Sequence, residues 1–238
     1  MKIHFSKLMV VMLSTIVLLP QAKAQDENKS MIRYGPKLGM TVSSFSDSQP
    51  HTGYNIGFTV GGFVEYGVTD QLSLQAEPAY LEQGGSYVRF IDDSRFGTGA
   101  LPQHATSSRT TVRNIDLPLL AKYQVAQFGD LKTTVVLGPA VSYTISATDA
   151  YETTYIEDRS YRTVNNSRNV TSQYEPFTFG VTAGFGGEVN IGANSLFIDF
   201  RYRYGITSTK KGYSYIDLYD VQGDLRTHSA YVTIGISL

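Results

Sequence analysis

The sequence predicts an all-β protein, an eight-stranded antiparallel up-and-down transmembrane β-barrel with short periplasmic turns and long extracellular loops. Three observations support this prediction: segments that alternate apolar and polar residues, connections that alternate in length, and glycines and charges gathered on the polar face. Alternation with a period of two is the pattern of a strand with two different faces. The eight segments that show it are 34–45, 54–68, 71–82, 111–125, 131–146, 175–190, 195–206 and 229–238.

The final segment, 229–238, shows this alternation without interruption. Its apolar parity holds Ala230, Val232, Ile234, Ile236 and Leu238, and its other parity holds Ser229, Tyr231, Thr233, Gly235 and Ser237. A strand at this position either pairs inside a soluble sandwich or closes a barrel. In a barrel it pairs with both 195–206 and 34–45.

The connections between the segments alternate between short and long. Tight turns follow the second, fourth and sixth segments, whereas longer polar stretches occupy 46–53, 83–109, 147–174 and 207–224. This alternation is typical of bacterial outer-membrane barrels. The segments also exceed the roughly 9–11 residues that a tilted membrane strand needs. An even number of strands closes the sheet without leaving an edge.

The alternative is a secreted β-sandwich, in which the apolar face would form the core. Glycines on the polar parity favour the barrel, because they weaken strands but make room in a crowded interior; they are Gly57, Gly61, Gly138, Gly180, Gly184, Gly186, Gly205 and Gly235. Tyrosines near strand ends on the apolar parity agree with an interfacial girdle; they are Tyr66, Tyr80, Tyr123, Tyr143, Tyr202 and Tyr204.

The polar parity also carries four basic and five acidic residues, namely Lys37, Glu65, Glu77, Asp116, Lys122, Glu188, Asp199, Arg201 and Arg203. Unpaired buried charge is costly. Side chains just fill the interior of an eight-stranded barrel. We therefore expect a hydrogen-bonded ion network that plugs the barrel. The competing interpretation is a path for protons or ions.

The first 24 residues have the features of a secretory signal peptide. Lys2 and Lys7 precede an apolar run at 8–19, and Ala22-Lys23-Ala24 supplies a small-x-small site, so we expect cleavage after Ala24. The run is shorter than the roughly 20 residues of a membrane anchor. Residues 25–33 are expected to form a short disordered leader, and 34–238 the barrel domain.

Composition excludes several functions. Removing residues 1–24 takes away three of the 20 basic residues and none of the 21 acidic ones, which leaves a formal net charge of 17 − 21 = −4. This charge excludes a strongly basic nucleic-acid-binding protein. The chain has no cysteine, so thiolate catalysis and thiolate metal sites are excluded.

Four stretches resemble a known family: YGPKLGMTVSSF at 34–45, GFVEYGVTDQLSLQAEPAY at 62–80, IDLPLLAKY at 115–123 and LGPAVSY at 137–143. They are similar to the PorT-like outer-membrane β-barrel family. The resemblance implies an eight-stranded barrel in the outer membrane, which depends on the outer-membrane assembly machinery. Some relatives take part in protein secretion. The chain ends in Leu238, where barrel chains often end in an aromatic residue.

Two classes of function remain open. One is a structural or interaction barrel that serves secretion or adhesion, and its candidate binding surface is the loop with Tyr213, Tyr215 and Tyr219, since tyrosine is favoured at recognition surfaces. The other is a protease, lipase or acyltransferase at the rim, using residues such as His51, His104, His228, Asp92, Asp93, Asp217, Asp220 and Asp224. No hydrolase, zinc-protease or phosphate-loop motif is present. We expect no cofactor and no metal.

Overall fold

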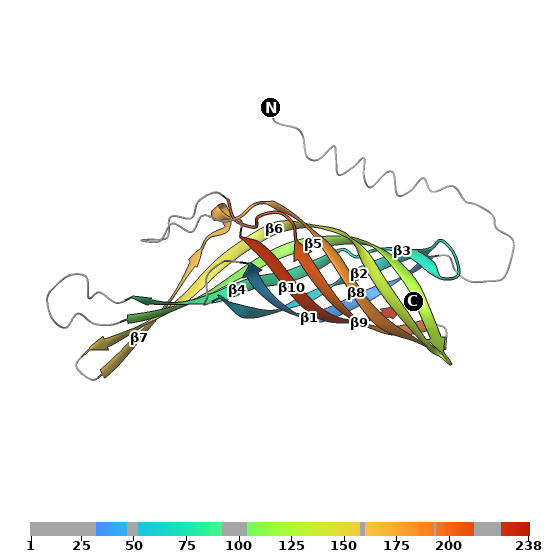
Figure 1. Cartoon of the computed structure of the whole chain (residues 1–238), viewed down its shortest axis with the longest axis horizontal. Coiled ribbons are helices and arrows are strands. Elements are labelled where there is room, and N and C mark those ends of the chain that lie inside the picture. The colour runs from blue at the N-terminus through green and yellow to red at the C-terminus, as the bar shows by residue number, and fades with distance from the viewer. Residues whose placement is uncertain (1–31, 47–51, 92–103, 158–159, 193, 212–224) are drawn as a thin grey trace, which may run out of the picture. The chain divides into compact units, whose positions relative to one another are not determined.

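The computed structural model describes residues 32–46, 52–91, 104–157, 160–192, 194–211 and 225–238. These residues belong to one compact unit, Met31–Leu238, and their strands form a closed antiparallel sheet (Figure 1). The predicted signal peptide, 1–24, lies outside the described residues, as does most of the predicted leader. Among the described residues, no helix is long and apolar enough to cross a bilayer.

The sheet has ten strands and one short 3-10 helix, η2, lies beside it. The elements in chain order are β1 (Ile32–Ser46), β2 (Thr52–Gly67), β3 (Leu72–Ala76), β4 (Ala79–Ile91), β5 (His104–Phe128), β6 (Leu131–Glu157), β7 (Ser160–Asn169), η2 (Thr171–Gln173), β8 (Phe177–Ile191), β9 (Asn194–Gly205) and β10 (Arg226–Ser237).

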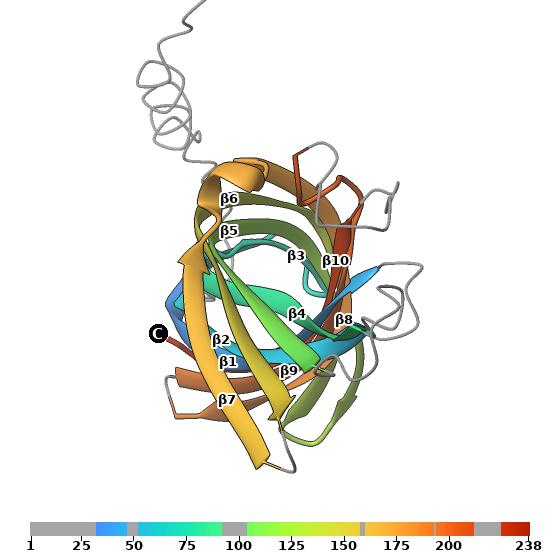
Figure 2. The same cartoon turned by 90° about the vertical axis from the view of Figure 1, so that its left-hand side faces the viewer.

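The last strand closes the ring. β10 pairs with β9 on one side, as in Ile234↔Ile198, and with β1 on the other, as in Ile234↔Leu38. β3 and β4 occupy one position between β2 and β5, and β7 pairs with β6 alone, so the ring itself has eight strands. The view along the barrel shows this closed ring with β7 projecting from it (Figure 2). The predicted fold class is confirmed.

The predicted segment 71–82 is interrupted where β3 gives way to β4. Pro78 has no backbone N–H to donate and so cannot continue the ladder. The neighbouring backbone is satisfied across the gap, because Gly62 N–H donates to the Pro78 carbonyl at 3.1 Å and Glu77 N–H donates to the Pro118 carbonyl at 3.1 Å. The interruption leaves the Glu77 side chain buried inside the ring.

The sequence prediction was wrong about two of the long polar stretches. Much of 83–109 extends β4 and β5, and much of 147–174 forms the end of β6 together with β7. β5 and β6 stay paired from Phe128↔Leu131 to His104↔Tyr155. The apolar alternation ends because these parts of the strands leave the lipid, whereas backbone pairing continues without it. We call the end with these extensions the long-loop end and the opposite end the short-turn end.

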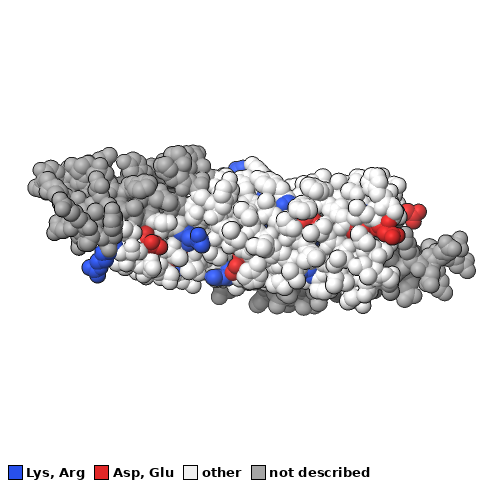
Figure 3. Space-filling view, turned by 90° about the horizontal axis from the view of Figure 1, so that it is seen from below, with Lys and Arg blue, Asp and Glu red and all other residues white. Residues whose placement is uncertain are grey.

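The two faces of the ring differ as the alternation predicts. Apolar side chains of every strand in the ring point outward, for example Met40, Leu137 and Phe179, which are 64%, 58% and 53% exposed. Aromatic pairs follow the long-loop border of this apolar band: Phe58–Tyr80, Tyr143–Phe177 and Tyr204–His228. One face of the molecule shows a mostly uncharged surface with small groups of charged residues (Figure 3). The apolar band therefore faces lipid.

A cap closes the interior near the long-loop end. Phe45, Val112, Ala147, Val170 and Tyr174 form a buried apolar cluster there. Backbone hydrogen bonds hold the two cap segments, 170–176 and 206–211, against each other: Glu175 N–H donates to the Thr209 carbonyl at 2.9 Å, and Lys211 N–H donates to the Gln173 carbonyl at 2.7 Å.

Candidate functional site

The interior of the ring holds a dense group of charged side chains. The nine residues singled out in the sequence, Lys37, Glu65, Glu77, Asp116, Lys122, Glu188, Asp199, Arg201 and Arg203, are each less than 9% exposed. Their strands are antiparallel neighbours in a small ring, so inward positions from opposite walls meet across its axis. The ion pairs fall into three tiers along that axis.

The first tier lies nearest the short-turn end and joins Arg33, Glu65, Lys122 and Glu188. The guanidinium of Arg33 pairs with Glu65 at 2.6 Å and with Glu188. The ammonium of Lys122 pairs with the same two carboxylates, at 3.2 Å to Glu65 and 2.9 Å to Glu188. Ser73 Oγ donates a further hydrogen bond to Glu65 at 2.7 Å. Two acids and two bases thus neutralise each other across four strands.

The second tier lies in the middle of the barrel and contains Lys37, Glu77, Asp199 and Arg201. Arg201 donates two bonds to the two oxygens of Glu77, at 2.6 and 2.8 Å, and a third to Asp199 at 2.7 Å. Lys37 Nζ lies 2.9 Å from Glu77 and 3.4 Å from Asp199. The Arg201 side chain is 0% exposed, so this tier is shielded from water.

The third tier is a smaller triangle of Arg203, Asp116 and Ser142. Arg203 pairs with Asp116 and donates to Ser142 Oγ at 2.8 Å. Ser142 in turn donates to Asp116 at 2.6 Å. The alternation of β9 supplies part of every level, since Asp199, Arg201 and Arg203 are successive inward residues of that strand.

An aromatic ring separates the first tier from the second. Lys37 Nζ lies 5.8 Å and Lys122 Nζ 5.5 Å from the centre of the Phe197 ring, within cation–π range. Phe63 packs edge-on against Phe197 with 5.0 Å between ring centres. Gly235 faces the same ring, and a Cβ there would lie 2.3 Å from Phe197 Cζ. The glycine of the last strand thus leaves the space that this aromatic ring fills.

Sequence reasoning missed Arg33, which it assigned to the disordered leader 25–33. The structure corrects this boundary, because β1 begins at Ile32 and Arg33 is a strand residue. With Arg33 the three tiers contain five bases and five acids, whereas the nine predicted residues carry one excess acid. The available signal was parity, since Arg33 lies four residues before Lys37 and therefore on the same face.

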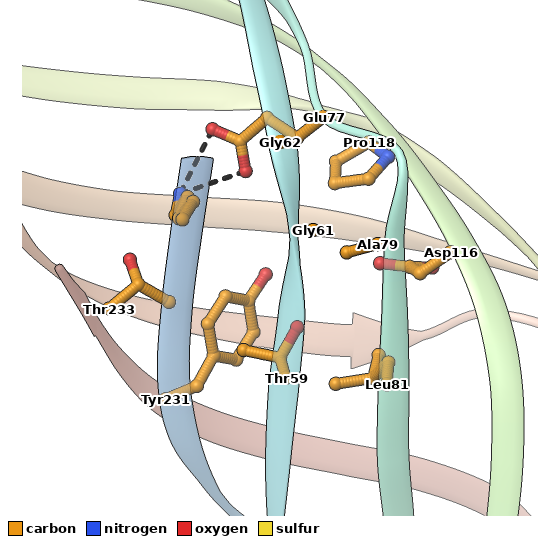
Figure 4. A pocket seen from close by; sticks show the side chains of 11 residues that line it. Thr59, Gly61, Gly62, Glu77, Ala79, Leu81, Asp116, Pro118, Tyr231 and Thr233 are labelled. Atoms are coloured by element: carbon orange, nitrogen blue, oxygen red, sulfur yellow. Dashed lines mark hydrogen bonds and ion pairs between the residues drawn. The ribbon is translucent and has the colours of Figure 1, made fainter. Parts of the chain in front are cut away.

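A small cavity adjoins the second tier. Figure 4 shows the side chains of Glu77, Tyr231, Thr59 and Thr233 around it. Its volume is about 20 Å³, which is room for a single water molecule. Such a space is far smaller than a channel, so side chains fill the part of the interior that the structure describes.

The residues considered for a rim enzyme are not assembled in the described structure. His228 lies on β10, where its Nδ1 is 3.2 Å from Tyr202 Oη and its ring packs against Tyr204. His104 begins β5, and His51 and the five loop aspartates lie outside the described residues. Tyr213, Tyr215 and Tyr219 also lie outside them. In the described ranges, no group of three or more His, Asp or Glu side chains could hold a metal ion.

A closed ring with a lipid-facing apolar wall and a neutralised interior defines the class: an integral outer-membrane β-barrel. Residues 23–211 match the family described as "Outer membrane protein beta-barrel domain", and the chain belongs to that family. The family places the protein in the outer membrane. No curated protein matches the sequence.

Several solved structures are similar in fold. Ail, the attachment invasion locus protein of Yersinia pestis, has 11% identity and a TM-score of 0.37, with 88% of this chain and 100% of that chain covered. Neisserial surface protein A has 14% identity and a TM-score of 0.40, covering 89% and 99%. The outer membrane protease OmpT of Escherichia coli has 10% identity and a TM-score of 0.43, covering 90% and 98%.

Proposed function

We propose that this protein is a non-conducting, non-enzymatic barrel that anchors a cell-surface interaction. The observation that carries the proposal is the length of β5 and β6, which have 25 and 27 residues. Roughly 9–11 residues suffice to span the membrane. The remainder, together with the end of β4 and with β7, builds a four-stranded sheet beyond the apolar band, which we call the projecting sheet.

The projecting sheet has the character of a recognition surface. Its described side chains are mostly hydroxyl, amide and basic groups, including Ser107, Arg109, Arg162, Asn165 and Ser167. β7 pairs only with β6 among the described strands, so its other edge offers backbone donors and acceptors. A sheet held by a rigid barrel presents these groups at low entropic cost.

The plugged interior supports the non-conducting half of the proposal. The three tiers fill the ring with paired charge, and the cap closes the long-loop end over the apolar cluster. Purified protein in planar bilayers is expected to show no steady conductance steps. Reproducible open steps in the wild type would overturn this half and favour an ion path.

The surface interaction is tested by shortening the projecting sheet. Asp149 and Arg168 are paired partners, so residues 150–167 can be replaced by an Asn-Gly turn that suits two antiparallel strands. A second variant lacks 212–224 and therefore Tyr213, Tyr215 and Tyr219. Both are checked for folding by their altered gel mobility before and after heating.

Cross-linking at the surface of intact cells then reads out the partner. We expect the wild type and the 212–224 deletion to capture the same partner and the shortened sheet to lose it. Loss only in the 212–224 deletion would move the binding surface to the tyrosine loop. Capture that survives both deletions contradicts a surface interaction at the long-loop end.

A PorT-like secretion role is the periplasmic version of the same proposal. It rests on the four matching stretches and predicts a partner captured by cross-linking from the periplasm rather than from the cell surface. Residues 1–24 are proposed to act as the cleaved signal peptide. Replacing Ala24 with a bulky residue is expected to leave the leader attached, as mass spectrometry of the purified protein would show.

A further inference from the structure

One ion pair lies on the outer wall of the barrel rather than inside it. Arg113 of β5 and Glu82 of β4 are on the lipid-facing parity, and Arg113 Nε lies 3.1 Å from Glu82 Oε1. Arg113 Nη1 also donates to Thr148 Oγ1 of β6 at 3.3 Å. The Arg113 side chain is 38% exposed and Glu82 15%. The neighbouring strands on both sides therefore hold the guanidinium in place.

This pair marks the upper border of the apolar band. Directly below it on β5, Ile115, Leu117 and Leu119 are exposed to lipid. Tyr80 of the aromatic girdle donates its hydroxyl proton to Glu82 at 2.9 Å. Above it, the outward position of β5 is the exposed Arg109, which pairs with Ser86 and Ala150. The pair therefore lies where acyl chains give way to head groups.

The backbone changes register at the same point. Arg113 pairs with Ser146 whereas Asn114 pairs with Thr144, so Ile145 is an extra residue in a β-bulge of β6. Bulges redirect side chains and often accompany functional sites. Ile145 is 46% exposed and adds apolar surface beside the acyl layer. The bulge thus separates a lipid-facing wall below from a polar wall above.

From these placements we infer that Arg113, with Arg109 above it, binds the phosphate group of a glycolipid in the outer leaflet. Nε and Nη1 of Arg113 have protein partners, whereas Nη2 has none among the described residues. A guanidinium fixed in this way offers a preoriented donor to a phosphate oxygen. The apolar wall below the guanidinium fits the acyl chains of the same lipid, which a free phosphate would leave unused.

Glu82 has a defined part in this site. Its carboxylate orients Arg113 but also partly cancels the positive charge that attracts phosphate. A Glu82→Gln variant keeps a hydrogen-bond acceptor for Nε and removes the negative charge. Lipid binding should therefore tighten in Glu82→Gln and weaken in Arg113→Ala, whereas a merely structural pair would respond alike to both changes.

The test measures thermal unfolding of the purified protein in detergent micelles as purified lipopolysaccharide is added. The wild type is expected to gain thermal stability with saturation. Arg109→Ala/Arg113→Ala should need about tenfold more lipopolysaccharide for a half-maximal shift, the size expected for losing a charge-assisted contact. Arg162→Ala, an exposed arginine of the projecting sheet, is the matched control and should behave like the wild type.

Three results would overturn the proposal. The double variant could respond to lipopolysaccharide like the wild type. Enzymatically dephosphorylated lipopolysaccharide could stabilise the wild type as well as the intact lipid does. Glu82→Gln could lose the response to the same extent as Arg113→Ala, which would assign the pair a structural role only. The Proposed function is independent of these outcomes, because partner capture by the projecting sheet does not involve this lipid.

Discussion

Replacing Arg201 with methionine is expected to destabilise the folded barrel by about 3–5 kcal/mol. The side chain is 0% exposed and donates three charge-assisted hydrogen bonds of 2.6–2.8 Å to Glu77 and Asp199. Methionine fills much of the volume but offers no donor. The two carboxylates then share only Lys37, so the middle tier carries one uncompensated negative charge away from water.

The assay is equilibrium urea unfolding of the barrel in lipid vesicles, followed by tyrosine fluorescence and gel mobility. A Glu77→Gln/Arg201→Met double variant leaves Lys37 paired with Asp199 and should cost less than the two single changes together, by up to about 3 kcal/mol. The exposed control Arg162→Met should stay within about 0.5 kcal/mol of the wild type. A cost for Arg201→Met below about 1 kcal/mol, as for a solvent-exposed pair, would refute the reasoning.

Two further predictions concern the packing and the cap. Gly235→Ala places a Cβ 2.3 Å from the pinned Phe197 ring and should cost about 1–3 kcal/mol in urea unfolding; Gly187→Ala, whose nearest neighbour is a side-chain methyl at 3.3 Å, should be nearly neutral. Burial lowers the pKa of Lys210 below its usual 10.5, although Asp149 opposes this shift. The unfolded chain therefore binds more protons than the folded one between the lowered pKa and 10.5, so stability rises with pH across that window. Lys210→Met should remove this rise, and an unchanged pH profile of the urea midpoint would contradict it.

Alternation with a period of two carried most of the fold prediction. Once Val232 and Ile234 are assigned to one face, Thr233 must occupy the other, and the same rule places Asp199, Arg201 and Arg203 together. The rule failed where its physical cause was missing. Beyond the membrane both faces of β6 and β7 are polar, so the strands there carry no alternation. Arg33 was missed because it precedes the first clear alternating segment.

The sequence by itself determined which side chains face lipid and which face the interior, because strand geometry makes facing a property of parity. Tertiary structure alone decided which charges meet. Arg201 reaches Glu77 across 124 positions of sequence, and Arg33 reaches Glu188 across 155. Those distances depend on the stagger between neighbouring strands as the ring closes. That stagger is set by pairing around the whole sheet, including the contact of β10 with β1, and no local pattern encodes it.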